Sequence, residues 1–383
     1  MRSIVFVVPF FNFGGFEKSI LRIAGYLNHY KPEIIITEND PSANLDLLNE
    51  VFSKVSYLGK ESKVFKNAKA FRLNRLLQRY NVVISLYDRY CASVSGFYCD
   101  KLYISLLRNH HPTSYARSVE NHQYFDVFAG NSTKITRELQ NRLPNNNKSR
   151  IELLPNGINI GSIKKKYDRL DQSSLKLIFV GRIINEAKNV FSLPEISKGL
   201  SDQNIDHQIT VLGDGTDLLR LKRLTTDLRV EQNFMFLGNC SNEDVKLKML
   251  EADVLLFTSF YEGLPNVILE AMSLGLIVVS SKLDGITTDF ISHGENGFLV
   301  ENNVSDYVSE ISRIRVLDNL QWISDNAVNT VRLNFSMERE RQIINSIVLS
   351  DIVHSRKYLF RQELINPWLY RLFNKIIKFK SLK

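Results

Sequence analysis

Short apolar runs alternate with helical patterns along most of the chain, which is typical of βα units that build parallel sheets. In the first half the predicted strands are Ile4–Val8, Glu33–Thr37, Val82–Ser85, Leu102–Leu107, Val127–Ala129 and Ile151–Leu154, with helices such as Glu17–Leu27 and Ala70–Tyr80 between them. A polar stretch over 161–174 interrupts the pattern, which starts again with Leu177–Val180, Ile209–Leu212, Phe234–Leu237, Val254–Phe257, Ile277–Ser280 and Gly297–Val300. The sequence therefore predicts an α/β protein with two Rossmann-like domains in series. Ligands of such sheets bind beyond the carboxyl ends of the strands, so the cleft between the domains is the expected site.

Composition and charge narrow the possible functions. The chain has 383 residues and a net charge of +8, of which residues 355–383 contribute most, with eight basic residues and one acid. The rest of the chain is nearly neutral, which argues against a distributed nucleic-acid-binding surface. The three cysteines, Cys91, Cys99 and Cys240, form no Cys-x-x-Cys pair, so we expect neither a disulfide framework nor a zinc site. We therefore expect the protein to work in a reducing compartment. No run approaches the roughly 18 apolar residues of a spanning helix, so any membrane contact is expected to be peripheral.

The strongest local motif follows the predicted strand Val254–Phe257 and places Glu262 in a loop and Glu270 about one turn into the next helix, which Pro265 can begin. Carboxylates accept pairs of hydroxyl hydrogen bonds, which suits the diols of sugars, and the amino end of a helix suits an anion. The alternative is that Glu262 caps the helix and Glu270 is a solvated surface residue.

Cations follow another predicted strand end. Arg182 and Lys188 come after Val180, where an arginine fork and a lysine point charge can meet at a phosphate, although two solvated loop cations are the alternative. No two aspartates are spaced as Asp-x-Asp, so a diphosphate held through Mg²⁺ is not expected, and its charge should be met by these cations and by helix amino ends.

Two further strand ends carry weaker motifs. Gly15 lies in a glycine turn after the first strand, and the adjacent His110 and His111 follow Leu102–Leu107, where they either face a ligand or serve polar packing. Leu212-Gly213-Asp214-Gly215 lacks the third glycine of a dinucleotide fingerprint, because Leu218 stands there. A nicotinamide dehydrogenase is therefore not favoured.

Together these motifs resemble the retaining glycosyltransferases of the family 4 (group 1) type, which have the GT-B fold. The resemblance rests on residues 14–19, on Leu154-Pro155-Asn156-Gly157-Ile158-Asn159, on Val180-Gly181-Arg182 with Lys188, on 212–215 and on Glu262 to Glu270. It implies an acceptor-side domain over 1–160, a nucleotide-sugar domain over 172–335 facing it across a central cleft, a helix about 336–350 that returns to the first domain, and a basic amphipathic tail over 351–383.

The resemblance also implies residue roles. It implies transfer of a hexose, with retention and without a required metal or cofactor, from a nucleotide-diphosphate sugar, with UDP-sugars favoured over GDP-sugars. Glu262 would hold the transferred sugar as a catalytic residue, helped by backbone N–H groups around Gly263, Leu264, Asn266 and Val267. Glu270 would bind the ribose diol, and Arg182, Lys188 and Gly15 would meet the diphosphate. The resemblance implies a catalytic histidine in the first domain, at His110 or His111, where a single histidine is usual in the family. Five residues separate Arg182 from Lys188, where four are more common.

The tail suggests where the acceptor lies. Pro367 can begin a helix with an aromatic-rich apolar face and a basic face, which suits an anionic bilayer surface, although docking on the first domain is the alternative. With the family resemblance, this predicts a peripheral enzyme on the inner face of the cytoplasmic membrane that acts on a lipid-linked or lipopolysaccharide glycan such as an O-antigen. A non-catalytic GT-B subunit that binds sugar or lipid, and a GT-B nucleotide-sugar 2-epimerase, are the alternative functions.

Overall fold

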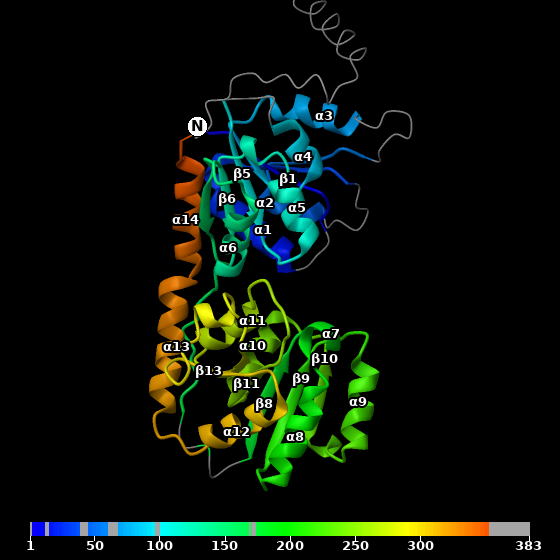
Figure 1. Cartoon of the computed structure of the whole chain (residues 1–383), viewed down its shortest axis with the longest axis vertical. Helices are drawn as coiled ribbons and strands as arrows, with labels where there is room; N and C mark the ends of the chain where they lie inside the picture. Colours follow the sequence, from blue (N-terminus) through cyan, green and yellow to red (C-terminus); the bar gives the residue numbers. More distant parts are fainter. Residues whose placement is uncertain are drawn as a thin grey trace, which may run out of the picture.

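Each half of the chain forms a fully parallel sheet covered by helices (Figure 1). The computed structural model describes residues 2–11, 15–38, 45–59, 68–95, 100–167, 170 and 174–351. The basic tail over 355–383, with the helix predicted from Pro367, lies outside these residues. In the described part of the chain, no helix combines the length and the apolar character that crossing a membrane requires.

The first sheet has the strand order β3-β2-β1-β4-β5-β6-β7. Its strands are β1 (Ile4–Val8), β2 (Glu33–Ile36), β3 (Lys54–Tyr57), β4 (Val82–Ser85), β5 (Leu102–Leu107), β6 (Val127–Gly130) and β7 (Arg150–Leu153), and its helices are α1 (Gly15–Tyr26), α2 (Leu45–Val51), α3 (Ala68–Leu77), α4 (Arg89–Val94), α5 (Pro112–Val119) and α6 (Thr133–Arg142). Phe6 packs into one core with α1 and α2, whereas its neighbours Val5 and Val7 pack into a second core with α3 and α6. Because both faces are buried, the strands are continuous apolar runs.

The second sheet has the order β10-β9-β8-β11-β12-β13. Its strands are β8 (Leu175–Val180), β9 (His207–Leu212), β10 (Phe234–Gly238), β11 (Val254–Phe257), β12 (Ile277–Ser281) and β13 (Phe298–Val300), and its helices are α7 (Asn185–Lys188), α8 (Ser192–Asp202), α9 (Leu218–Asp227), α10 (Asn242–Glu251), α11 (Asn266–Ser273), α12 (Val304–Ile314) and α13 (Leu320–Asn334). Leu177 and Phe179 face the core under α8 and α12, and Ile178 faces the core under α11.

The predicted strands occur with ends within two residues of the expected ones, and the two-domain α/β fold is confirmed. The pattern does not predict β3. This four-residue strand lies at the edge of the first sheet, its Lys54 is exposed and its other residues are only half-buried. An edge strand of this kind needs no apolar run, so it leaves no signal.

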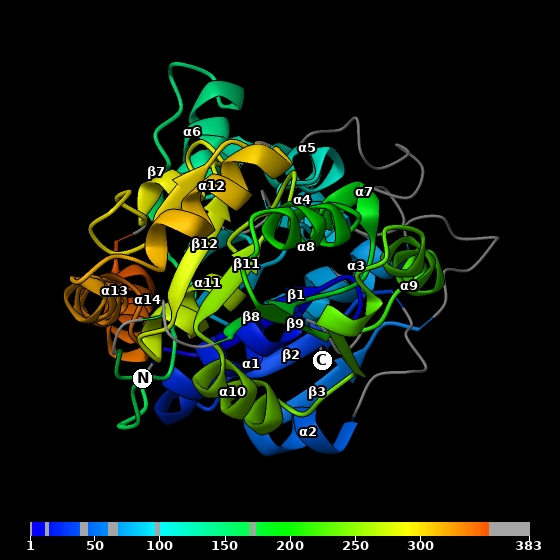
Figure 2. The ribbon, with the colours of Figure 1, turned by 90° about the horizontal axis from the view of Figure 1, so that it is seen from below.

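A pair of helices, α13 and α14 (Met337–Leu349), runs along one side of both domains (Figures 1 and 2). α13 packs against α11 of the second domain, whereas α14 packs against α1 and buries Ile344 and Ile347 in the first. Between them the Ser336 hydroxyl caps α14 by accepting the Arg339 N–H at 3.2 Å. The chain therefore crosses between the domains twice, once after Leu154 and once at Ser336.

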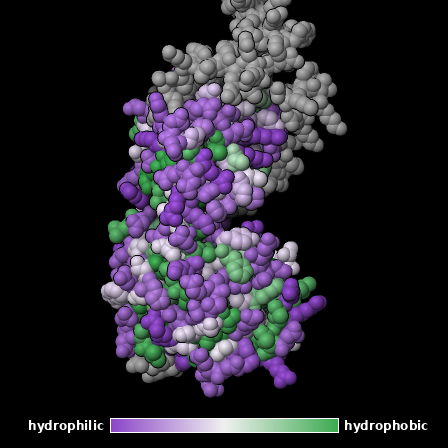
Figure 3. Space-filling model, viewed as in Figure 1, coloured by the Kyte–Doolittle hydropathy of each residue, from purple (hydrophilic) through white to green (hydrophobic). Residues whose placement is uncertain are grey.

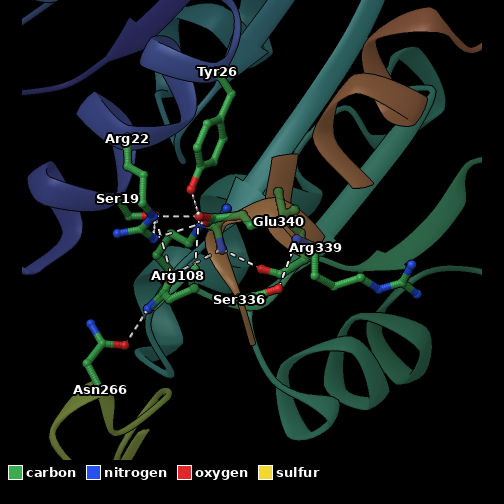
Figure 4. A network of polar contacts seen from close by, with 11 residues as sticks. Ser19, Arg22, Tyr26, Arg108, Asn266, Ser336, Arg339 and Glu340 are labelled. Carbon is green, nitrogen blue, oxygen red and sulfur yellow. Dashed lines mark hydrogen bonds and ion pairs between the residues drawn. The ribbon is translucent and has the colours of Figure 1, made fainter. Parts of the chain in front are cut away.

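The start of α14 is fixed to the first domain by a buried carboxylate, that of Glu340 (Figure 4). Its side chain is 1% exposed and forms a two-pronged ion pair with Arg22 of α1, with the Nη2–Oε1 distance at 3.0 Å. The Tyr26 hydroxyl donates to it at 3.2 Å and the Gly157 N–H at 2.9 Å. One carboxylate therefore joins α14, α1 and the interdomain linker.

Candidate active site

The strand order of both sheets reverses beside their first strand, between β1 and β4 and between β8 and β11. Such a switch point opens a crevice at the carboxyl ends of the strands. In the second domain, β8 is followed by Arg182 and Lys188, and β11 is followed by Glu262. The sequence motifs thus occupy the crevice that the topology creates.

These strand ends face the first domain. The Asn156 Nδ2 of the linker donates to Asn266 Oδ1 at the start of α11 at 2.8 Å, and Lys18 of α1 donates to Asn242 of α10 at 3.3 Å. The space-filling view shows the molecule hollowed between the domains on the side away from α13 and α14 (Figure 3). The motifs of the second domain therefore line a cleft between the two sheets.

The Gly-Asp-Gly segment after β9 supports the cation loop rather than offering a dinucleotide site. Gly213 has a φ of +131°, and a Cβ on it would lie 1.9 Å from the Gly181 carbonyl oxygen. A Cβ on Gly215 would lie 2.2 Å from the Ile183 carbonyl oxygen. Both glycines let the β9 loop pack directly under the β8 loop that carries Arg182.

Arg182 and Lys188 differ in their surroundings. Arg182 is exposed, and in the described ranges its guanidinium has no hydrogen-bond or ion-pair partner. Lys188 ends α7, forms a hydrogen-bonded ion pair with Glu262, and lies beside Gly181 despite the longer spacing from Arg182. The cation expected at the phosphate and the carboxylate expected at the sugar therefore form an ion pair with each other.

Three residues that the sequence does not single out hold the loop after β11. The three bonds reach three successive carbonyl groups. The Tyr307 hydroxyl donates to the Phe257 carbonyl at 2.6 Å. Asn302 Nδ2 donates to the Thr258 carbonyl at 3.0 Å, and the Ser281 hydroxyl donates to the Ser259 carbonyl at 2.7 Å. Ser259 Oγ also donates to Glu262 at 3.3 Å. These bonds come from elements up to 50 residues further along the chain, so local motifs give no signal for them.

The amino end of α11 faces the cleft with its backbone donors. Pro265 is the N-cap residue, and Asn266 and Val267 begin the helix, so their N–H groups have no acceptor within it. Gly263 and Leu264 precede the cap and are half-buried. This end of α11 fits the predicted hydroxyl or anion site.

Glu270 lies one turn into α11 and its carboxylate remains accessible. Desolvation by the surrounding protein raises its pKa, and the positive charges of Lys18, Lys246 and Arg22 oppose that shift. Two of these cations belong to α1 of the first domain, so Glu270 faces the other domain across the cleft. Gly15 begins that same helix.

His110 and His111 precede α5, and both have partners on that helix. His110 Nδ1 lies 2.6 Å from the Tyr115 hydroxyl, and desolvation lowers the pKa of His110. His111 is the N-cap residue of α5, and its Nδ1 accepts the Thr113 N–H at 3.3 Å. Among the described residues, no group of three or more His, Cys, Asp or Glu side chains is placed to hold a metal ion.

Parts of the chain are similar in sequence to known proteins. Residues 162–320 match the family model of the Glycosyl transferases group 1. The chain is 27% identical over 218 residues to UDP-Gal:alpha-D-GlcNAc-diphosphoundecaprenol alpha-1,3-galactosyltransferase of Escherichia coli, covering 54% of this chain and 55% of that protein. It is 29% identical over 140 residues to the lipopolysaccharide 1,6-galactosyltransferase of Salmonella typhimurium, covering 36% and 38%. The chain thus matches about half or less of the length of these relatives.

Solved structures share the whole architecture. The apo form of the lipopolysaccharide outer core galactosyltransferase WaaB superposes with a TM-score of 0.75 at 21% identity, covering 90% of this chain and 99% of that one. Anabaena HepE in complex with UDP superposes with a TM-score of 0.75 at 19% identity, covering 90% and 98%. At these identities the likeness shows a common fold.

Proposed function

We propose that the chain transfers a hexose from a nucleotide-diphosphate sugar to an acceptor hydroxyl, because residues 162–320 match the group 1 glycosyl transferases and the fold is GT-B. The observation that carries this proposal is the meeting of Arg182, Lys188, Glu262 and the amino end of α11 at one topological switch point that faces the first domain. Cations for a leaving diphosphate and acceptors for sugar hydroxyls lie within one loop cluster.

The proposed mechanism divides the donor among these groups. Arg182 and Lys188 stabilise the diphosphate as its charge grows during departure, without a required metal. Glu262 and the N–H groups of Gly263, Leu264, Asn266 and Val267 hold the transferred sugar, whose transition state resembles an oxocarbenium ion. Glu270 accepts hydrogen bonds from the ribose diol, and Gly15 lets the diphosphate approach the start of α1 closely.

Retention is proposed on the strength of the motif resemblance, with a phosphate oxygen of the donor accepting the acceptor proton. Donor binding has to separate Lys188 from Glu262, because each then takes a different part of the donor. UDP-sugars are the preferred donors in this proposal, since the first relative named above uses a UDP-sugar.

A lipid-linked or lipopolysaccharide glycan is the proposed acceptor. The relatives from Escherichia coli and Salmonella typhimurium are named for such acceptors. The basic segment 355–383 adds a means of peripheral contact with an anionic membrane on the side where the donor sugars are made. The proposed acceptor and the proposed membrane contact of the basic segment both predict a transferase that works at the membrane surface.

A thermal-shift screen of UDP, GDP and ADP and their sugar forms, with EDTA present throughout, tests the donor site. We expect a nucleotide to stabilise the wild type and to lose most of this effect with Glu270→Ala. Glu251→Ala, an exposed glutamate at the far end of α10, is the matched control and should respond as the wild type does. Stabilisation that is absent with EDTA and appears only when the screen is repeated with Mg²⁺, or that persists in Glu270→Ala, contradicts the proposed site.

Product analysis then separates transfer from the alternative functions. A transferase releases nucleotide in step with added acceptor and gives a glycoside whose anomeric configuration, read by NMR, matches the donor. Release of free sugar and nucleotide without any acceptor indicates a 2-epimerase-like reaction. Binding of a sugar by a protein that binds no nucleotide indicates a non-catalytic subunit. A soluble oligosaccharide that turns over as fast as its lipid-linked form contradicts the proposed acceptor.

A further inference from the structure

The donor loop, residues 258–265 after β11, leads into α11, whose first residue is Asn266. The N-cap residue is Pro265, so no side-chain hydrogen bond of a cap residue secures the first turn. The Asn266 carboxamide is instead held from outside the second domain, because its Oδ1 accepts a hydrogen bond from Asn156 Nδ2 at 2.8 Å (Figure 4). The end of α11 that faces the cleft is therefore attached to the linker between the domains.

Asn156 has only its amide nitrogen to offer to the second domain. The residue is 5% exposed, and its Oδ1 accepts hydrogen bonds from the Ser19 hydroxyl and from Arg108 Nη1, each at 3.4 Å. Because these donors of the first domain occupy the oxygen, the nitrogen has to point the other way. Asn156 therefore has one orientation, and in that orientation it donates to α11.

The backbone on both sides of Asn156 is fixed as well. The Leu154 carbonyl accepts a hydrogen bond from Arg108, and the Gly157 N–H donates to Glu340 at 2.9 Å. A Cβ on Gly157 would lie 2.6 Å from Glu340 Oε2, so no larger residue leaves room for that carboxylate. Such support holds Asn156 in place without help from α11, as a residue that positions another requires.

Other contacts between the domains lie at the surface. Lys18 donates to Asn242 of α10 at 3.3 Å between exposed side chains. Arg137 pairs with Asp284 at 3.2 Å, and these side chains are 55% and 87% exposed. Water competes for such contacts, so each contributes little to the relative position of two elements. A hydrogen bond from the buried linker is better placed to fix the end of α11.

We propose that Asn156 is a positioning residue of the donor site, which fixes the amino end of α11 so that the N–H groups of Asn266 and Val267 point at the transferred sugar. This inference rests on the proposed function, because the end of α11 has this task only if a nucleotide sugar binds. Since Asn156 is buried, it acts through Asn266 rather than on the donor. Its loss should reduce the contribution of the sugar to binding and leave that of the nucleotide unchanged, because Arg182 and Lys188 lie on another loop.

Asn156→Leu removes this bond, because leucine has a similar size and cannot donate. Calorimetry with UDP, UDP-glucose and UDP-galactose measures the gain in affinity that the sugar brings. GDP with GDP-mannose, or ADP with ADP-glucose, replaces these probes if the thermal-shift screen selects another nucleotide. We expect Asn156→Leu to bind the nucleotide as the wild type does and the preferred nucleotide sugar about tenfold more weakly. Asn242→Ala, which removes the exposed contact with Lys18, is the matched control and should keep both affinities within about twofold.

Conservative variants separate positioning from a general loss of structure. Asn156→Asp still accepts from Ser19 and Arg108, and its second oxygen can accept the Asn266 amide once that carboxamide turns over, so most of the gain from the sugar should return. Asn156→Asp/Asn266→Asp places two carboxylates face to face without a donor and should lose that gain again. The single variant Asn266→Asp completes a double-mutant cycle. We expect a coupling of about tenfold in the affinity for the nucleotide sugar and none in the affinity for the nucleotide.

The outcomes separate the two claims. The role of Asn156 alone is overturned if Asn156→Leu gains as much from the sugar as the wild type, if it loses affinity equally for nucleotide and nucleotide sugar, or if Asn242→Ala shows the same loss. If Asn156→Leu does not fold, the cycle decides, and a cycle without coupling in the nucleotide-sugar affinity overturns the role. A wild type that binds a nucleotide and gains nothing from its sugar also overturns it. A wild type that binds none of the nucleotides in the screen overturns the proposed function and this inference with it.

Discussion

Replacement of Arg22 by methionine tests the buried carboxylate that fixes α14 to the first domain. Methionine keeps most of the aliphatic length and removes the charge, so the Glu340 carboxylate stays buried with only the Tyr26 hydroxyl and the Gly157 N–H as partners. Removing one partner of a buried ion pair costs about 3–5 kcal/mol. Arg22 itself is 18% exposed, and the screening by water favours the lower end of that range, about 3 kcal/mol.

Hydrogen exchange of the α14 amides measures this directly, because it reports the local opening of one helix in a protein whose two domains need not unfold together. A loss of about 3 kcal/mol accelerates exchange by roughly a hundredfold, at about 1.4 kcal/mol for each factor of ten. Amides of β12 in the second domain should be unaffected and serve as an internal reference.

Arg341→Met is the matched control on the same helix. Its pair with Glu338 spans 3.5 Å between two side chains that are both 57% exposed, so its loss should change exchange by less than about fivefold. The double variant Arg22→Met/Glu340→Met should exchange more slowly than Arg22→Met, because it no longer buries an unpaired charge. Equal exchange in Arg22→Met and the wild type would refute the argument that the ion pair holds α14 in place.

Four further substitutions probe the two domains. Gly213→Ala forces a Cβ against the Gly181 carbonyl oxygen at a positive φ, so we expect a loss of about 2 kcal/mol or more in urea unfolding together with weaker nucleotide binding. Burial raises the pKa of Asp88 from 3.8 to about 6, so the folded state binds the proton more tightly than the unfolded state does. The free energy of unfolding should therefore fall as the pH rises from 4 to above 6. Urea titrations of Asp88→Asn should show no such fall. Lys188→Met should weaken UDP binding about tenfold, whereas Glu262→Gln should strengthen it, because Lys188 then has no carboxylate partner. Calorimetry in which both variants bind UDP more weakly, or both more tightly, contradicts the proposed exchange of partners.

The fold was predictable because both sheets are buried on two faces. Runs such as Ile4–Val8 and Val254–Phe257 are uniformly apolar for that reason, and each ends where the chain leaves the core. The edge strand β3 escapes prediction because its residues face solvent as well as neighbours. The basic tail over 355–383 lies outside the described residues, so its helix and its membrane contact stay predictions.

The sequence predicts which charged residues gather at the candidate site, but it does not predict which of them form ion pairs or hydrogen bonds with one another. Charged residues at strand ends are visible in a sequence, and parallel topology brings those ends together, which is how Arg182, Lys188 and Glu262 come to one place. The ion pair between Lys188 and Glu262 depends on how two loops are placed in the folded protein, and these residues are 74 positions apart in the sequence. The role of Tyr307 depends likewise on tertiary contacts, because a carbonyl accepts from any hydroxyl that the fold brings within reach.

The linker connects the two crossings between the domains with the donor loop. The Ile158 N–H donates to the Phe335 carbonyl at 2.7 Å, and Ile158 pairs with Ser336, so the two crossings lie side by side. A few residues earlier, Arg108 holds the Leu154 carbonyl from the first domain, and its own carbonyl lies against Gly263 of the second. The first-domain segment that lies against the donor loop is therefore tied to the start of the linker. The bonds of Glu340 to Arg22 and to the Gly157 N–H fix α14 and the linker to α1, so both crossings are anchored to the first domain.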